Sequence, residues 1–91
     1  MMYEYIDSNC FRKAQHIEIE NDFLVSHRLN NLQSLKAAAI YLKNSLDCLG
    51  TLKELTLTNT GILDFVRLMN AAPNLLFLSL FNAELMCCEI D

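Results

Sequence analysis

The chain of 91 residues has little glycine and proline, with two glycines, one proline and no tryptophan. A phosphate-binding loop needs several glycines at close spacing, so Gly50 and Gly61 alone give no support for nucleotide binding. Basic residues are also few, at 7 Lys and Arg against 11 Asp and Glu, and they form no cluster. Because neutralising a run of phosphates needs clustered positive charge, we expect no nucleic-acid partner.

Long apolar runs are also missing, although 53% of the residues are hydrophobic. The longest stretches, such as 75–81, fall far short of the roughly 18 to 20 residues that span a bilayer. The N-terminus carries Glu4 where a secretory signal would carry positive charge, and no apolar segment follows it. We therefore expect no membrane partner and an intracellular location, cytoplasmic or nuclear.

Neither a metal site nor a catalytic site is indicated. Metal-finger spacing is absent from the cysteines, which are Cys10, Cys48, Cys87 and Cys88. Free thiols in a reducing compartment are the expectation. His16 and His27 lack a second ligand pair for zinc. A triad of Cys48, His27 and Asp47 is conceivable, but no nucleophile motif surrounds Cys48. We expect no enzyme activity, no catalytic or metal-binding residue and no cofactor.

One short pattern occurs three times along the chain. Each copy reads apolar, any residue, apolar, any residue, Asn, two further residues and an apolar residue. The copies start at Ile17, Leu55 and Leu78, and their asparagines are Asn21, Asn59 and Asn82. Alternating apolar residues predict short strands with one face inward. Asn suits the sharp turn that follows, because its side chain bonds backbone groups and tolerates unusual backbone angles. We predict strands near 16–20, 54–58 and 77–81.

Two helices are expected between these strands. Residues 62–72 carry apolar side chains at helical spacing before Pro73, and residues 29–42 carry them along one side. The second and third copies are 23 residues apart, within the range of about 20 to 29 for leucine-rich repeats, whereas the first and second are 38 apart. The first unit is therefore expected to be irregular, either a degenerate repeat or an N-terminal cap. Alternatively, residues 29–49 form a free amphipathic helix for dimerisation.

These strings resemble the leucine-rich-repeat family, most strongly over residues 52–85, and look most like ribonuclease-inhibitor-type and F-box-associated repeats. The family usually places its Asn or Cys one position later than this chain does. The resemblance implies an α/β fold, a short solenoid with parallel strands on the concave side and helices on the convex side. Residues 1–91 would form a single domain or fragment of about three repeats. In this family the concave surface grips a partner protein, often as the recognition arm of ubiquitin-ligase adaptors.

Between the inward apolar residues, other side chains should project from the sheet face in columns across the strands. The three columns are His16, Glu54 and Phe77, then Glu18, Thr56 and Ser79, then Glu20, Thr58 and Phe81. This surface grades from acidic at the first strand to aromatic at the last. It suits a protein partner that bears both Lys or Arg and an apolar anchor. The predicted function is a protein-binding module that acts through this face.

The alternative is a structural role. The strand at 78–80 would be a terminal strand with an open edge, and the tail 86–91 is too short to form a capping helix. The chain would then be a fragment of a longer array, or it would close this edge against a partner or against another copy in a homo-oligomer. In that case Phe77 and Phe81 would pack on a following repeat.

Overall fold

The computed structural model describes residues 5–43 and 48–86. The fold is α/β, as predicted, with parallel strands and an α-helix among the described residues. In chain order the elements are β1 (Tyr5–Asp7), the 3-10 helix η1 (Ser8–Phe11), β2 (His16–Glu18), β3 (Asp22–Val25), β4 (Ser34–Ala37), β5 (Ile40–Leu42), β6 (Glu54–Leu57), β7 (Gly61–Asp64), α1 (Phe65–Ala71), β8 (Phe77–Leu80) and β9 (Ala83–Met86). The three segments predicted as strands contain β2, β6 and β8.

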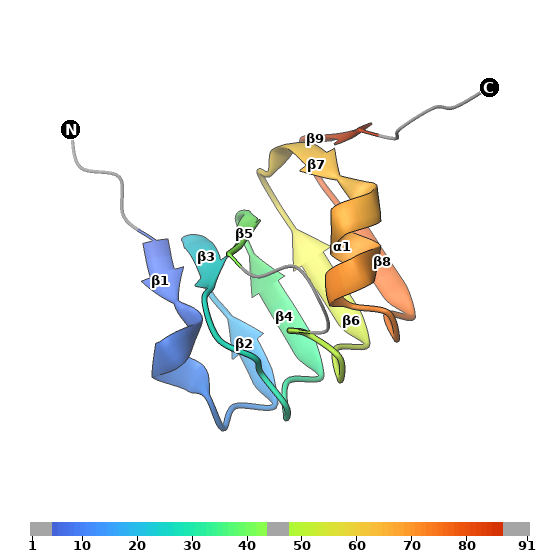
Figure 1. The fold of residues 1–91 in the computed structure, drawn as a ribbon. Coiled ribbons are helices and arrows are strands. Elements are labelled where there is room, and N and C mark those ends of the chain that lie inside the picture. The colour runs from blue at the N-terminus through green and yellow to red at the C-terminus, as the bar shows by residue number, and fades with distance from the viewer. Residues whose placement is uncertain (1–4, 44–47, 87–91) are drawn as a thin grey trace.

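The largest sheet has the strand order β2-β4-β6-β8, with every pair parallel, and Figure 1 shows these strands side by side in chain order. After each of them a turn leads to a strand of a second row, which forms the parallel sheets β1-β3-β5 and β7-β9. The residues in register along the core side of the large sheet are Ile17, Leu35, Leu55 and Leu78, which are 18, 20 and 23 residues apart. The strands of the large sheet thus follow one another at intervals of similar length, and each is called a unit together with the turn and the second-row strand that follow it.

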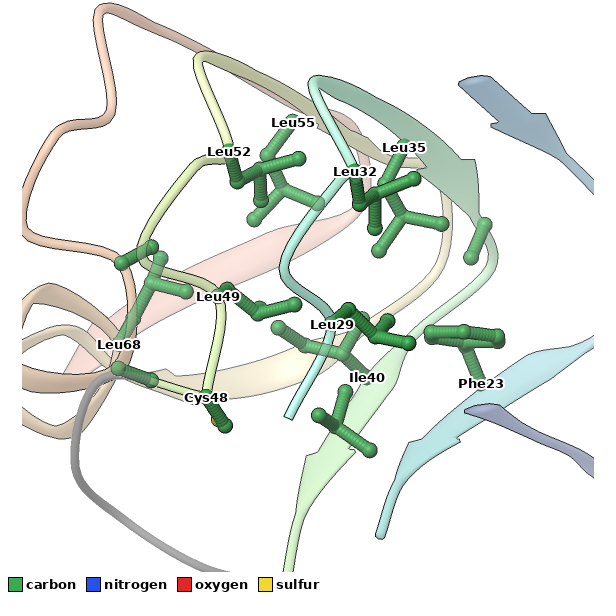
Figure 2. Packing of buried hydrophobic residues seen from close by; sticks show 14 of the residues in the cluster. Phe23, Leu29, Leu32, Leu35, Ile40, Cys48, Leu49, Leu52, Leu55 and Leu68 are labelled. Atoms are coloured by element: carbon green, nitrogen blue, oxygen red, sulfur yellow. The ribbon is translucent and has the colours of Figure 1, made fainter. Parts of the chain in front are cut away.

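A hydrophobic core lies between the large sheet and the second row. Leu35 and Leu55 enter it from the sheet, and Phe23 and Ile40 enter it from β3 and β5. Figure 2 shows Leu32 and Leu35 beside Leu52 and Leu55, so equivalent side chains of successive units stack on one another. Burying these stacked leucines is the main source of stability for strands as short as three or four residues.

The turns before the sheet strands are joined by a backbone hydrogen-bond ladder. The N–H of Leu29 donates to the carbonyl of Cys48 at 2.8 Å, and the N–H of Leu49 donates to the carbonyl of Ala71 at 2.9 Å. Buried backbone polar groups must be paired, and here the pairing passes from each unit to the next. The stacking of units therefore pairs the backbone N–H and carbonyl groups of the turns as well as those of the strands.

The predicted helix at 29–42 is wrong, because β4 and β5 occupy this segment. Leu29, Leu32 and Leu35 are all buried, and their three-residue spacing fits a turn followed by a strand as well as one face of a helix. The alanines after Leu35 favour a helix by intrinsic propensity, but pairing with strands on both sides outweighs that preference. The described part of 29–49 therefore contains no free dimerisation helix.

This correction also resolves the irregular spacing. The 38-residue interval contains one complete further unit built around β4, so the large sheet has four strands where three were expected. The missing signal is the asparagine, because Ala39 follows β4 at the position that Asn21 and Asn59 hold in their units. The first unit is consequently neither enlarged nor irregular.

The predicted helix at 62–72 is correct only in its second part. Strand β7 takes the beginning of this segment, and α1 follows it as a seven-residue helix. Asp64 is the N-cap, since its Oδ1 accepts a hydrogen bond from the N–H of Arg67 at 3.1 Å. Leu68 of α1 is fully buried, near Leu49 in Figure 2. No helix in the described ranges is long and apolar enough to cross a membrane.

The turn role expected of asparagine is observed at one position. Asn82 has φ 52° and is the one non-glycine residue of the described chain with positive φ; Gly61, with φ 69°, donates its N–H to the carbonyl of Asn82 at 3.2 Å. Asn21 and Asn59 do not adopt this conformation. Within residues 5–43 and 48–86, the three asparagine side chains make no hydrogen bond, so the predicted side-chain contact to the turn is wrong there.

Candidate functional site

The face of the large sheet that points away from the core, called the open face below, carries the predicted columns. Strand register aligns His16, Glu54 and Phe77 with Ser34 of β4 between the first two. It aligns the second column in the same way, where Glu18, Thr56 and Ser79 are joined by Lys36. The structure thus brings the residues of both columns together and adds one β4 residue to each, which sequence reasoning missed when it assigned β4 to a helix.

The third column lies just past the ends of the strands, where the backbone ladder continues. The N–H of Phe81 donates to the carbonyl of Leu57 at 2.9 Å, and the N–H of Thr58 donates to the carbonyl of Ala37 at 3.1 Å. These bonds hold the backbone at Thr58 and Phe81 in line across the sheet. Glu20 and Phe81 are exposed, and Thr58 is half-buried between their positions.

Charge on the open face is less one-sided than the sequence suggested. The Nζ of Lys36 lies 4.0 Å from Oε2 of Glu18, and the two side chains are 51% and 78% exposed. A pair so exposed adds little stability, but it does offset part of the acidity of β2. Glu20 makes no ion pair with any residue that the structure describes.

Two shallow depressions are found at opposite ends of the sheet strands. The one at the carboxyl ends has a volume of about 430 Å³ and is lined by Glu18, Ile19, Glu20, Lys36 and Thr58. The one at the amino ends has a volume of about 200 Å³ and is lined by His16, Gln33, Ser34, Lys53, Glu54, Leu76 and Phe77. Six of the nine predicted site residues line one or the other depression, and the remaining three, Thr56, Ser79 and Phe81, line neither.

Exposed apolar side chains gather at β8. Leu76, Phe77 and Phe81 are 67%, 62% and 58% exposed, and they are three of the five exposed large hydrophobic residues in the described part of the chain. On the other side of the same strand, Leu78 and Leu80 face the core and are half-buried. A unit stacked on β8 would therefore cover the two leucines, whereas Phe77 would still project from the open face.

A second polar cluster joins the N-terminal segment to the turn after β3. Ser8 is fully buried, and its Oγ accepts hydrogen bonds from the N–H of Ser26 at 2.9 Å and from the N–H of His27 at 3.1 Å. The Ser26 hydroxyl donates to Oδ1 of Asp7 and lies 2.9 Å from Nδ1 of His27. No local sequence signal indicated this cluster, because its partners are about 18 residues apart.

The cluster contains Ser, His and Asp, but their order differs from that of a catalytic triad. In a triad the imidazole lies between the carboxylate and the hydroxyl, so that it takes the hydroxyl proton. Here the Ser26 hydroxyl lies between Asp7 and His27. The Asp7 carboxylate accepts a hydrogen bond from the Ser26 hydroxyl and does not orient the imidazole as a base. The cluster therefore joins the N-terminal segment to the turn after β3.

Acid should weaken the link between the N-terminal segment and the turn after β3, because one of its hydrogen bonds is accepted by the Asp7 carboxylate. The pKa of Asp7 lies below its ordinary value of 3.8, chiefly because the Ser26 hydroxyl and then the Asn9 N–H bond the charged carboxylate. An unfolded chain lacks these bonds, so the stabilisation is complete above about pH 5 and is lost as the pH falls through the lowered pKa. We expect the stability difference between wild type and Asp7→Asn, measured by urea unfolding, to be constant near neutral pH and to shrink in acid.

Ser26→Ala provides the matched control, because it removes the largest cause of the lowered pKa of Asp7. In the wild-type background, Ser26→Ala should make the free energy of unfolding depend less on pH in acid. In the Asp7→Asn background, it should leave the pH dependence of that free energy unchanged. A stability difference that persists undiminished to pH 2 would contradict this role for the carboxylate.

The cysteine considered as a nucleophile is part of the core. Cys48 is 4% exposed and belongs to the buried cluster, while Asp47 lies outside the described residues. A buried cysteine in apolar surroundings acts as a small hydrophobic residue. Among the described residues, no group of three or more His, Cys, Asp or Glu side chains is placed to hold a metal ion. Exposed polar and aromatic groups lie together on the open face.

Comparisons with protein-family models, with curated proteins and with solved structures found no significant match to this chain.

Proposed function

We propose that the chain is a leucine-rich-repeat solenoid that binds a partner protein through the open face and catalyses no reaction. The repeat part of the proposal is supported by the parallel large sheet, whose equivalent core positions recur after 18, 20 and 23 residues. The second and third intervals lie within the usual length of about 20 to 29 residues for such repeats, and the first is just below it. The continuous leucine core and the ladder between turns support it further.

The binding part rests on the exposed aromatic end of the open face. Phe77 and Phe81 project from the sheet with more than half of each side chain exposed. Large aromatic side chains surrounded by polar residues are the usual anchors of protein interfaces, since each buries a large area at little entropic cost. Thr56, Ser79 and Glu54 provide polar neighbours of this kind.

Capture of partners by the immobilised chain tests the proposal. Phe77→Ser with Phe81→Ser removes both anchors at exposed positions, so the circular dichroism spectrum should not change. Val66→Ser is the control, because Val66 is 51% exposed on α1 and away from the open face. A captured protein, once purified, should bind the double variant at least about tenfold more weakly and the control equally well, as measured by calorimetry. Equal binding by all three chains would contradict the proposal.

A second candidate function is assembly through the edge of the sheet at β8. It is favoured by Leu78 and Leu80, which are half-buried although their partners in register on β6, Leu55 and Leu57, are 1% and 0% exposed. Light scattering separates the two candidates. A concentration-dependent dimer that Leu80→Glu abolishes and the phenylalanine double variant leaves intact would favour assembly over binding through the open face.

A further inference from the structure

On the open face, negatively charged residues and large apolar residues lie at opposite edges of the sheet. Glu18 and Glu20 lie at the β2 edge, and Phe77 and Phe81 lie at the β8 edge. Between these edges the second column carries Lys36 and the half-buried Thr56. A ligand that contacts both edges must therefore be polar at one end and apolar at the other.

The β2 edge favours a cation. Glu18 and Glu20 line one depression with Lys36, whose single charge leaves this site net negative. Lys36 already approaches Glu18, whereas Glu20 has no ion pair among the described residues. A ligand carboxylate would face two glutamates here, while a ligand ammonium or guanidinium would pair with Glu20. Repulsion from Lys36 would keep that cation on the β2 side of the site.

The width of the sheet sets the length of the ligand. From β2 to β8 there are three strand intervals, which at roughly 4.8 Å each amount to about 14 Å. An extended polypeptide advances about 3.3 Å per residue, so about four residues bridge the two edges. A peptide lying across the strands reaches both the glutamates and the phenylalanines, and a single side chain does not.

We propose that the open face binds an extended polypeptide segment with Lys or Arg about four residues from an aromatic or branched apolar residue. The cation lies at Glu18 and Glu20, and the apolar side chain packs on Phe81, which shares a column with Glu20. This inference rests on the proposed function and specifies the chemistry of its partner. The half-buried Thr56 and Thr58 offer hydroxyls along the path between the two anchors.

Selection from a phage library of random dodecapeptides against the full chain tests this chemistry. The enriched peptides should share a cation about four residues from an apolar anchor. A synthetic peptide of the enriched sequence, followed by fluorescence anisotropy, should bind Glu18→Gln with Glu20→Gln at least about tenfold more weakly and with less dependence on salt. Lys36→Gln should bind it more tightly, because a competing positive charge is removed.

The outcomes distinguish this inference from the proposed function. Enriched peptides that lack the cation, bind the glutamine double variant normally and fail on Phe77→Ser with Phe81→Ser would overturn the cation site and leave the binding face standing. Peptides that bind all variants alike would contradict both, because they would bind elsewhere. A selection that enriches no peptide would overturn the extended segment as ligand, and the capture experiment with folded proteins would then decide the proposed function separately.

Discussion

Replacing Leu55 with Ala is expected to lower the free energy of unfolding by about 2 to 5 kcal/mol, the usual cost of truncating a buried leucine. Leu55 is 1% exposed, lies in the core and is paired in register with Leu35 on one side and Leu78 on the other. Its loss leaves a cavity at two stacking contacts at once. Since a domain of this size is stable by only about 5 to 15 kcal/mol, the urea midpoint should fall sharply.

Leu78→Ala is the matched control for this effect. Leu78 holds the same register position on the neighbouring strand and is only half-buried. The same truncation there should cost at least about 1 kcal/mol less, because the side chain loses fewer contacts. Equal destabilisation by the two variants would mean that the core does not stack in the way the strand register indicates.

Replacing Ser8 with Ala should cost about 2 kcal/mol, although it removes only one oxygen atom. That oxygen is fully buried and accepts the N–H groups of both Ser26 and His27. Without it two backbone donors in part-buried hydrogen bonds lose their partner, and an unsatisfied donor that water reaches poorly costs more than a typical hydrogen bond contributes. Thermal or urea unfolding of the purified variant measures the loss.

Asn9→Ala controls for changes in the 3-10 helix itself. Asn9 is exposed, and its hydrogen bond to Asp7 comes from its backbone N–H, which the substitution keeps. Its cost should stay within about 0.5 kcal/mol, as for most surface substitutions. If Ser8→Ala proved no more destabilising than Asn9→Ala, the buried hydroxyl would not be what joins the N-terminal segment to the turn after β3.

Strands were predictable wherever two apolar residues alternate ahead of an asparagine. That pattern located β2, β6 and β8 and placed the columns of the open face in their correct order. It failed at β4, where Ala37 replaces a larger apolar residue and Ala39 stands in place of asparagine. Lys36 was lost from the predicted site for the same reason.

Other features depend on contacts that no local pattern records. The strands of the second row have three or four residues each, and they form because equivalent segments of neighbouring units pair with them. The buried role of Ser8 likewise arises only when the turn at Ser26 is brought beside it. Tertiary pairing decides such elements, and propensity or spacing does not.

Each strand of the large sheet pairs only with the strands immediately before and after it in that sheet's order. If the chain is the repeat solenoid proposed above, its free energy is close to a sum of unit terms and nearest-neighbour coupling terms, as in a one-dimensional chain of linked sites. An inner strand such as β6 contributes to two couplings, and β8 contributes to one within the described sheet. A ligand that spans β2 to β8 would add a coupling between units that otherwise do not touch, so binding would make the four units open and close more nearly as one.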